Sequence, residues 1–265
     1  MSDAAILPGK AWRKVCSAAA QTSADYRLLE PGDRALAALS GGADSFVMLE
    51  VLLELQKRVP FEFTLEAVSF DPGFPQLDIG LIAEYCAVRN VRHHVTAMNI
   101  PFMLEQTPQT RFRRPCVWCS RMRRGKLYGL AREKGFNKLA LGHHADDLLE
   151  SFIMSLMRGQ GLTTMAVNVP ADTLHGNNGA LRIIRPLAMI CENVVKQSAK
   201  QFEFPAVGDC PYQAALAESG DRAWVKRKLA EWAESIPDLR QLMLKSLQHV
   251  ETEYLLDRKH LSYLQ

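Results

Sequence analysis

The sequence predicts an α/β protein built on a parallel sheet, with a helical segment at its C-terminal end. Short apolar runs that read as strands alternate with stretches of helical spacing through residues 31–205. Beyond them, apolar residues recur at helical spacing only. Strands that alternate with helices of this length indicate βαβ units, whose sheet is covered on both faces. We therefore expect a helical lead-in over 1–30, an α/β domain over 31–205 and a C-terminal helical segment over 206–265.

Each element is predicted from its own pattern of apolar residues. Runs bounded by turn residues predict strands over 35–39, 63–70, 91–97 and 138–142. Apolar residues three and four apart predict helices over 11–24, 45–57, 79–86, 117–134 and 146–157. Residues 159–180 are rich in Gly, Asn and Thr and are expected to form a long loop over the site, after which 181–187 return as an edge segment.

Two antiparallel helices are expected on either side of Pro237. The apolar face of the first is predicted to hold Trp224, Val225, Leu229, Trp232 and Ala233. The apolar face of the second is predicted to hold Leu239, Leu242, Met243, Leu247 and Val250.

Composition favours a cytoplasmic protein with no membrane partner. The 265 residues are 48% hydrophobic with a formal net charge of +3. No apolar stretch approaches the roughly 20 residues that span a bilayer, and the first residues lack the pattern of a signal peptide. In the cytoplasm the six cysteines are expected to stay reduced, for metal binding, redox chemistry or packing. Cys16 and Cys86 fall on apolar helical faces and are expected in the core.

A phosphate-binding loop is predicted where the strand at 35–39 ends. Gly41 and Gly42 let backbone N–H groups converge, and the following helix adds the positive end of its dipole. The hydroxyls of Ser40 and Ser45 can donate to phosphate oxygens, and Asp44 suits a magnesium ligand. An ordinary turn with Ser40 or Asp44 as N-cap is the competing interpretation. GxxxxGKS/T and GxGxxG are absent, which disfavours Walker-type NTPases and dinucleotide folds.

A second polar cluster follows the strand at 138–142. It consists of Gly142, His143, His144, Asp146 and Asp147. Because the carboxyl ends of parallel strands meet at one edge of the sheet, we expect this cluster to share a cleft with the loop at 40–45. Imidazoles and carboxylates there can position Mg²⁺ or nucleotide phosphates. Helix capping, the competing interpretation, accounts for one aspartate only.

The remaining cysteines suggest an iron–sulfur site. Cys116 and Cys119 form a CxxC pair, which occurs in redox dithiols, zinc sites and iron–sulfur sites. No second CxxC or HxxxH pair is present, so a four-ligand structural zinc site is disfavoured. Cys210 lies in a predicted loop and can join the pair to hold a cluster with one iron left open. Cys191 is the weaker alternative as the third ligand.

Basic residues gather around the CxxC pair. Between residues 111 and 134 the only acid is Glu133, against the basic residues Arg111, Arg113, Arg114, Arg121, Arg123, Arg124, Lys126, Arg132 and Lys134. Such a cluster suits an RNA backbone, with Phe112 and Trp118 available to stack on an unpaired base. We expect Arg121, Arg123, Arg124 and Lys126 to bind RNA. A solvated basic helix face is the competing interpretation.

The order of these motifs resembles the tRNA 2-thiocytidine biosynthesis family of PP-loop proteins. SGGxDS, PGFP, CxxCSRxRRGxLY, LGHHxDD, IRPL and a third cysteine occur here in one order, as Ser40–Ser45, Pro72–Pro75, Cys116–Tyr128, Leu141–Asp147, Ile184–Leu187 and Cys210. The resemblance implies a Rossmann-like fold of the adenine nucleotide alpha hydrolase type. It also implies an AMP-forming, ATP-dependent tRNA sulfurtransferase, in which a cytidine 2-oxygen is adenylated and then replaced by sulfur.

The resemblance further implies cofactors, partners and residue roles. ATP and Mg²⁺ would be bound by Ser40, Gly41, Gly42, Asp44, Ser45, His143, His144, Asp146 and Asp147. A 4Fe-4S cluster would be held by Cys116, Cys119 and Cys210, which with Asp44 are the expected catalytic residues. The expected partners are tRNA and a sulfur donor such as a cysteine desulfurase, with a homodimer left open.

Two departures from the family pattern leave alternatives open. Ala43 stands where the family usually has the lysine of SGGKDS, and Cys210 stands alone where the family tends to carry a second CxxC-like pair. One alternative is a non-thiolating PP-loop ligase similar to lysidine synthetases. Another is a non-catalytic, zinc-containing RNA-binding protein, and a third is a sulfur-transfer enzyme for a small molecule or another RNA position.

Overall fold

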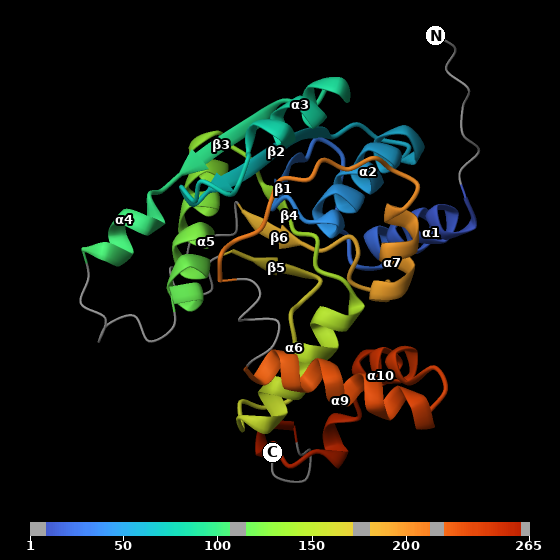
Figure 1. The fold of residues 1–265 in the computed structure, drawn as a ribbon. Helices are drawn as coiled ribbons and strands as arrows, with labels where there is room; N and C mark the ends of the chain where they lie inside the picture. Colours follow the sequence, from blue (N-terminus) through green and yellow to red (C-terminus); the bar gives the residue numbers. More distant parts are fainter. Residues whose placement is uncertain (1–8, 107–114, 172–180, 213–219, 261–265) are drawn as a thin grey trace.

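A computed structural model describes residues 9–106, 115–171, 181–212 and 220–260 of the chain (Figure 1). Its centre is a six-stranded sheet in the order β3-β2-β1-β4-β6-β5. The strands are β1 (Arg34–Leu39), β2 (Thr64–Asp71), β3 (His93–Ala97), β4 (Lys138–Ala140), β5 (Asn168–Pro170) and β6 (Arg182–Ile184). All neighbouring pairs are parallel except β5 with β6. The predicted α/β class with a parallel sheet is confirmed.

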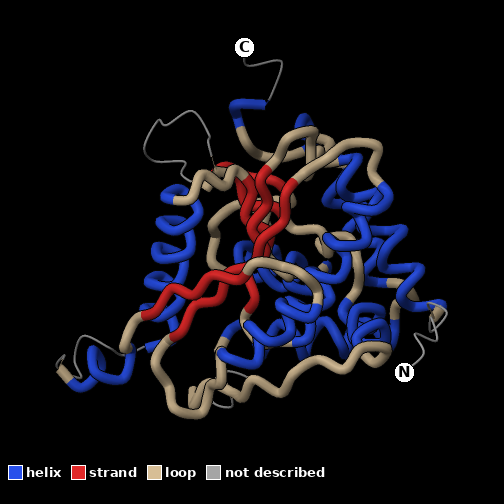
Figure 2. The backbone as a smooth tube through the Cα atoms, turned by 90° about the horizontal axis from the view of Figure 1, so that it is seen from above, coloured by secondary structure: helices blue, strands red, loops and turns tan. Residues whose placement is uncertain are grey.

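Helices cover both faces of the sheet, as the view from above shows (Figure 2). On one face α1 (Lys10–Asp25), α2 (Ala43–Arg58), α3 (Gly80–Val88) and α7 (Glu192–Ala199) enclose the larger apolar core. On the other face α5 (Pro115–Glu133) packs against β2 and β3, and Ile100 of α4 (Ile100–Glu105) lies in the smaller apolar core on this face. The side chains of β1 alternate between the cores, with Ala35 and Ala37 on the α2 side and Leu36 on the α5 side. Cys16 and Cys86 are buried in the larger core, as predicted.

The C-terminal helices pack on the helix that follows β4. The helices α6 (Ala145–Met157), α9 (Asp221–Ser235) and α10 (Leu239–Gln248) share a small core of Ala145, Leu149, Val225, Leu229 and Leu244, and the short 3-10 helices Thr252–Tyr254 and Arg258–His260 follow. The two helices around Pro237 are therefore confirmed, but their faces differ from the prediction. Trp224 and Trp232 are each 40% exposed, because the smaller Val225 and Leu229 face α6. Leu242 and Val250 are also exposed, and Leu244 is the buried residue of α10.

Three further expectations need correction. The predicted loop 159–180 contains β5, and residues 172–180 lie outside the described part. The segment at 181–187 is not an edge, because β6 lies between β4 and β5 and the short β5 forms the edge. The helices α4 and α7 were not predicted from the sequence. Within the described residues, no helix has the length and apolar character needed to cross a membrane.

The segment after α7 is fixed to the larger core by stacked aromatic rings. The Phe202 ring stacks on Phe204 with centroids 5.2 Å apart and meets the edge of Trp12 at 5.0 Å. Phe204 in turn stacks on Phe46 of α2, also at 5.2 Å. Such pairs add stabilisation beyond the area that they bury. They set the direction in which the chain continues toward residues 207–210.

Residues 207 and 208 then cross the carboxyl edge of the sheet. The carbonyl oxygen of Val207 accepts a hydrogen bond from the N–H of Asp78 at 2.8 Å. A Cβ on Gly41 would lie 3.0 Å from the Cβ of Val207, so the two segments are in contact. Gly208 has φ +94°, and a Cβ there would lie 2.0 Å from the carbonyl oxygen of Gln76. The chain thus passes between the loops that follow β1 and β2.

This crossing gives a stability prediction. Gly208→Ala must strain a positive φ and displace the backbone at Gln76, whereas Gly32→Ala, at φ +80° with open space around its Cβ position, carries the strain alone. We expect Gly32→Ala to lower the free energy of unfolding by about 1 to 2 kcal/mol and Gly208→Ala to lower it by clearly more. Urea unfolding of both variants measures the difference. Equal decreases would contradict the tight crossing.

Candidate active site

The phosphate-binding loop lies between β1 and α2. Gly41 has φ +88°, a conformation that glycine adopts without strain. The Ser45 hydroxyl donates to the carbonyl oxygen of Gly42 at 2.7 Å and accepts from the N–H of Ser40 at 3.2 Å. Gly42 is the N-cap of α2, and no side chain caps this helix. The competing interpretation, in which Ser40 or Asp44 serves as N-cap, is therefore wrong, and the helix start remains suited to an anion.

The loop after β4 lies directly against the start of α2. A Cβ on Gly142 would lie 3.0 Å from the carbonyl oxygen of Asp44, a tighter contact than side chains usually make, so the two segments touch. The Nε2 atom of His144 is 4.0 Å from Asp44 Oδ2 and 3.5 Å from Asp147 Oδ2. His144 is buried, and among the described residues its Nδ1 atom has no hydrogen-bond partner, with the carboxylate oxygen Oδ2 of Asp146 lying 3.8 Å away. The predicted shared cleft is thus formed by an imidazole between two carboxylates.

The charges of this cluster influence one another. Burial raises the pKa of Asp44, the carboxylate of Asp147 raises it further, and His144 lowers it. Asp147 also accepts a hydrogen bond from the N–H of His144 at 3.0 Å, which caps the start of α6. Asp44 is 41% exposed at its side chain and can therefore be reached by a ligand. A divalent cation here would relieve the repulsion between the carboxylates.

His143 is held by an arginine that the sequence analysis left without a role. Arg185 Nε lies 3.3 Å from His143 Nδ1, and an Nη atom of Arg185 donates to the carbonyl oxygen of Ala166. Burial, together with the charge of Arg185, lowers the pKa of His143 to about 4. His143 is therefore neutral at pH 7, and the IRPL motif serves to orient the two-histidine loop.

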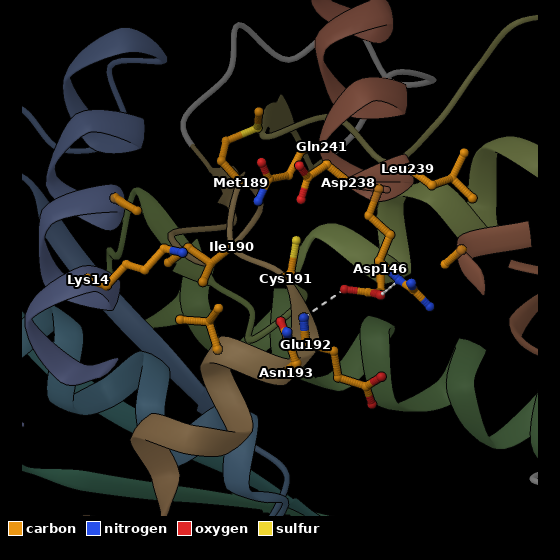
Figure 3. Close-up of a pocket in the computed structure, with 14 residues that line it drawn as sticks. Lys14, Asp146, Met189, Ile190, Cys191, Glu192, Asn193, Asp238, Leu239 and Gln241 are labelled. Atoms are coloured by element: carbon orange, nitrogen blue, oxygen red, sulfur yellow. Dashed lines mark hydrogen bonds and ion pairs between the residues drawn. The ribbon is translucent and has the colours of Figure 1, made fainter. Parts of the chain in front are cut away.

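Asp146 faces a different part of the molecule. Its Oδ2 atom accepts from the N–H of Glu192 at 2.7 Å, and its Oδ1 atom is paired with Arg240 (Figure 3). A cavity of about 470 Å³ lies on this side, lined by residues of α1, α7, α9 and α10 and by none of Ser40–Ser45. Both carboxylate oxygens have partners within the protein, so Asp146 helps to attach the C-terminal helices. Its Oδ2 atom also lies 3.8 Å from Nδ1 of His144, so Asp146 adjoins the two-histidine loop as well, and its expected role in cofactor binding stays a prediction.

Three cysteines lie near one another on the α5 side of the sheet. Cys116 and Cys119 lie at the start of α5, and Cys210 follows the crossing at Val207 and Gly208. All three are half-buried free thiols. Burial raises the pKa of Cys116 and Cys119, and the negative charge of Cys210 raises both further, which places Cys210 near the pair.

The surroundings of these thiols are apolar and aromatic. Cys119 and Cys210 pack with Trp118 and Tyr212 against the core on the α5 side, and Tyr212 meets the edge of Phe74 from the PGFP loop. Cys191 lies elsewhere, at the start of α7, where it lines the cavity of Figure 3 and its neighbours in charge are Asp146, Arg240 and Lys14. The structure thus brings Cys210, and not Cys191, to the CxxC pair.

The donor set fits an iron–sulfur cluster better than a single ion. Within the described ranges, no group of three or more His, Cys, Asp or Glu side chains is arranged closely enough to hold a metal ion. A four-iron cluster separates its cysteine ligands more widely than one ion does, and soft thiolates are its usual ligands. Three thiols from two elements, in an apolar setting, are compatible with a cluster that keeps one iron open.

The predicted RNA-binding residues lie on the outer face of α5. Arg121, Arg123, Arg124 and Lys126 are exposed, whereas Leu127 is buried against the sheet. The charge of Arg123 lowers the pKa of Cys119, so the basic face adjoins the cysteines. Trp118 is half-buried in the core on the α5 side and not an open stacking surface. Arg111, Phe112, Arg113 and Arg114 lie outside the described residues.

Side chains of α7 and α9 complete the site and were missed from the sequence. Arg222 Nε lies 3.3 Å from Glu150 Oε2, and its Nη1 atom lies 3.8 Å from Asp147 Oδ1. Lys196 and Lys226 each place Nζ 2.8 Å from Glu192 Oε1. No motif contains these residues, so only the three-dimensional arrangement connects them to the loops at 40–45 and 142–147.

Comparison with known proteins gives the family of this chain. The PP-loop domain family matches residues 15–231 of the chain. A tRNA-cytidine(32) 2-sulfurtransferase of Alkalilimnicola ehrlichii is 39% identical over 89% of this chain and 72% of that protein. The protein of the same name from Pelobacter propionicus is 36% identical over 94% of this chain and 90% of its own length.

A solved structure shares the fold. It is the U34-tRNA thiolase NcsA of Methanococcus maripaludis with its 4Fe-4S cluster. The two structures superpose with a TM-score of 0.70 at 20% sequence identity, over 91% of this chain and 80% of the thiolase chain. The expected adenine nucleotide alpha hydrolase type of fold is thereby confirmed. Family match, relatives and fold agree that the chain belongs to the PP-loop family, in the group of the tRNA-cytidine(32) 2-sulfurtransferases.

Proposed function

We propose that this protein uses ATP to replace the 2-oxygen of a tRNA cytidine by sulfur. The observation that carries the proposal is the position of Cys210. The chain before it crosses next to the PP-loop at Val207 and Gly208, and Cys210 itself lies near Cys116 and Cys119. The names of its relatives give the substrate class, tRNA cytidine. A non-thiolating ligase would not need three thiols at this place.

The first step is adenylation of the base. The N–H groups of the loop and the hydroxyls of Ser40 and Ser45 bind the phosphates of ATP at the start of α2. The cytidine 2-oxygen attacks the α-phosphorus, the bond to the β-phosphate oxygen breaks, and pyrophosphate leaves. Mg²⁺, held through Asp44, would neutralise charge on the phosphates. His144 lies between Asp44 and Asp147, with Nε2 4.0 and 3.5 Å from their carboxylate oxygens.

The second step exchanges oxygen for sulfur. The adenylated 2-oxygen is a good leaving group, and a sulfide nucleophile that forms a bond to C2 displaces it as AMP. When a 4Fe-4S cluster is bound, it supplies an open iron that can hold the sulfide. Cys116, Cys119 and Cys210 would hold the cluster, in a setting where Trp118 and Tyr212 pack against the same core as Cys119 and Cys210. A cysteine desulfurase is the expected source of the sulfur.

The cysteines give the direct test of this function. Replacing Cys116, Cys119 or Cys210 by Ser should abolish the visible absorption of the anaerobically reconstituted protein, because each removes one of three thiolate ligands. Each variant, introduced into a deletion strain, should also leave 2-thiocytidine in tRNA at the level of the deletion strain.

Cys191→Ser is the matched control, because Cys191 is also half-buried but lies at the cavity of Figure 3. It should keep both the absorption and the modified nucleoside. A full cluster in the Cys210 variant would rule out Cys210 as a ligand. Undiminished 2-thiocytidine in the deletion strain itself would refute the function.

The basic face of α5 gives a prediction for tRNA binding. Replacing Arg121, Arg124 and Lys126 together by Ala should weaken tRNA binding and reduce the slope of log K against log salt by about 0.7 to 0.9 for each phosphate that is no longer neutralised. A filter-binding series across salt concentrations measures the slope. Lys57→Ala with Arg58→Ala, at the far end of α2, is the control and should leave the slope unchanged. An unchanged slope in the α5 variant would support the competing interpretation, in which this basic helix face is in contact with water and does not bind RNA.

A further inference from the structure

The PP-loop of this chain lacks a cation that the chemistry of its ligand calls for. Position 43, the first residue of α2, is alanine, and the side chains of the loop around it are hydroxyls and one carboxylate. A bound triphosphate carries several negative charges, and an ammonium or guanidinium beside it forms short, charge-assisted hydrogen bonds. A cation from another part of the chain can fill this place.

The start of α7 is fixed next to the loop. The N–H of Ala145 donates to the carbonyl oxygen of Ile190 at 2.9 Å, and the N–H of Glu192 donates to Asp146 Oδ2 at 2.7 Å (Figure 3). These two bonds join α7 to the first turn of α6. That turn contacts the start of α2 through Gly142 and His144, and α7 itself packs along α2. The first turns of α2, α6 and α7 therefore converge.

Lys196 lies one turn into α7 and is held by Glu192. Its Nζ atom is 2.8 Å from Glu192 Oε1, and Lys226 of α9 reaches the same oxygen at 2.8 Å. The two ammonium groups lower the pKa of Glu192 to about 2, so this carboxylate stays ionised. Within this trio one positive charge is left uncompensated.

Two further observations connect Lys196 with the phosphate-binding loop. Its side chain is 63% exposed, so the ammonium can turn to a ligand without uncovering apolar surface. The helix that carries Lys196 packs along α2, whose first turn follows the phosphate-binding loop. We propose that Lys196 supplies the phosphate-facing ammonium that position 43 lacks, an inference that rests on the proposed use of ATP.

The test removes the ammonium group at position 196 and places one at position 43. Lys196→Ala should weaken the binding of ATP with Mg²⁺ by about ten- to a hundredfold, as measured by calorimetry, because the ammonium that binds phosphate is removed. Ala43→Lys should restore most of that affinity when added to Lys196→Ala and should change little in the unaltered protein. Lys200→Ala, an exposed lysine at the end of the same helix, is the matched control and should bind ATP normally.

Adenosine separates a phosphate contact from a structural role. It lacks phosphates, so its affinity should be the same in Lys196→Ala as in the unaltered protein, and a parallel decrease would overturn the proposal. ATP binding by Lys196→Ala within about twofold of the unaltered protein, or a decrease that Ala43→Lys does not reverse, would also overturn it, and each leaves the proposed function standing. Absence of ATP binding by the unaltered protein would refute the proposed function itself.

Discussion

The crossing of the chain over the carboxyl edge of the sheet is the constraint on which the site depends. Gly208 passes so close to Gln76 that a single added carbon would overlap its carbonyl oxygen, and Val207 rests on Gly41. The aromatic rings of Phe202 and Phe204 fix the approach to this point. Because the crossing lies between two strand ends, the cysteine that follows it is delivered to the same edge as the nucleotide loop. The proposed function depends on this arrangement, because it needs phosphate and sulfur chemistry at one edge of the sheet.

A second close approach joins the two motif loops. Gly142 lets the chain after β4 touch the first turn of α2, which places His144 between carboxylates from different helices. The charges of His144 and Asp147 both act on the pKa of Asp44, so the two loops are joined electrostatically as well as by contact.

The motif-bearing elements were predictable because local sequence determines them. The strand at 35–39 and the helix at 45–57 carry strong apolar patterns and appear as β1 and α2 with nearly the same bounds. The helix α7 has only eight residues and owes its stability to packing on α1 and α2, which no local pattern reveals.

The functional residues also divide into those that the local sequence predicts and those whose position depends on the folded chain. Asp146 and Asp147 look equivalent in the sequence, yet adjacent helical residues point about 100° apart, so Asp146 accepts from the N–H of Glu192 while Asp147 accepts from the N–H of His144. Likewise, only the path of the chain after α7 decides which loop cysteine approaches the CxxC pair.

The helix α6 belongs to two parts of the molecule at once. Its first turn forms the site, while Ala145 and Leu149 lie in the core of the C-terminal helices. Those helices therefore cannot unfold by themselves without uncovering apolar surface on the helix that His144 caps. Local opening at the C-terminal end is therefore expected to reach the first turn of α6, and a ligand that orders this turn is expected to stabilise the packing of α9 and α10. Binding of a ligand at the site and folding of α9 and α10 are thus expected to be coupled.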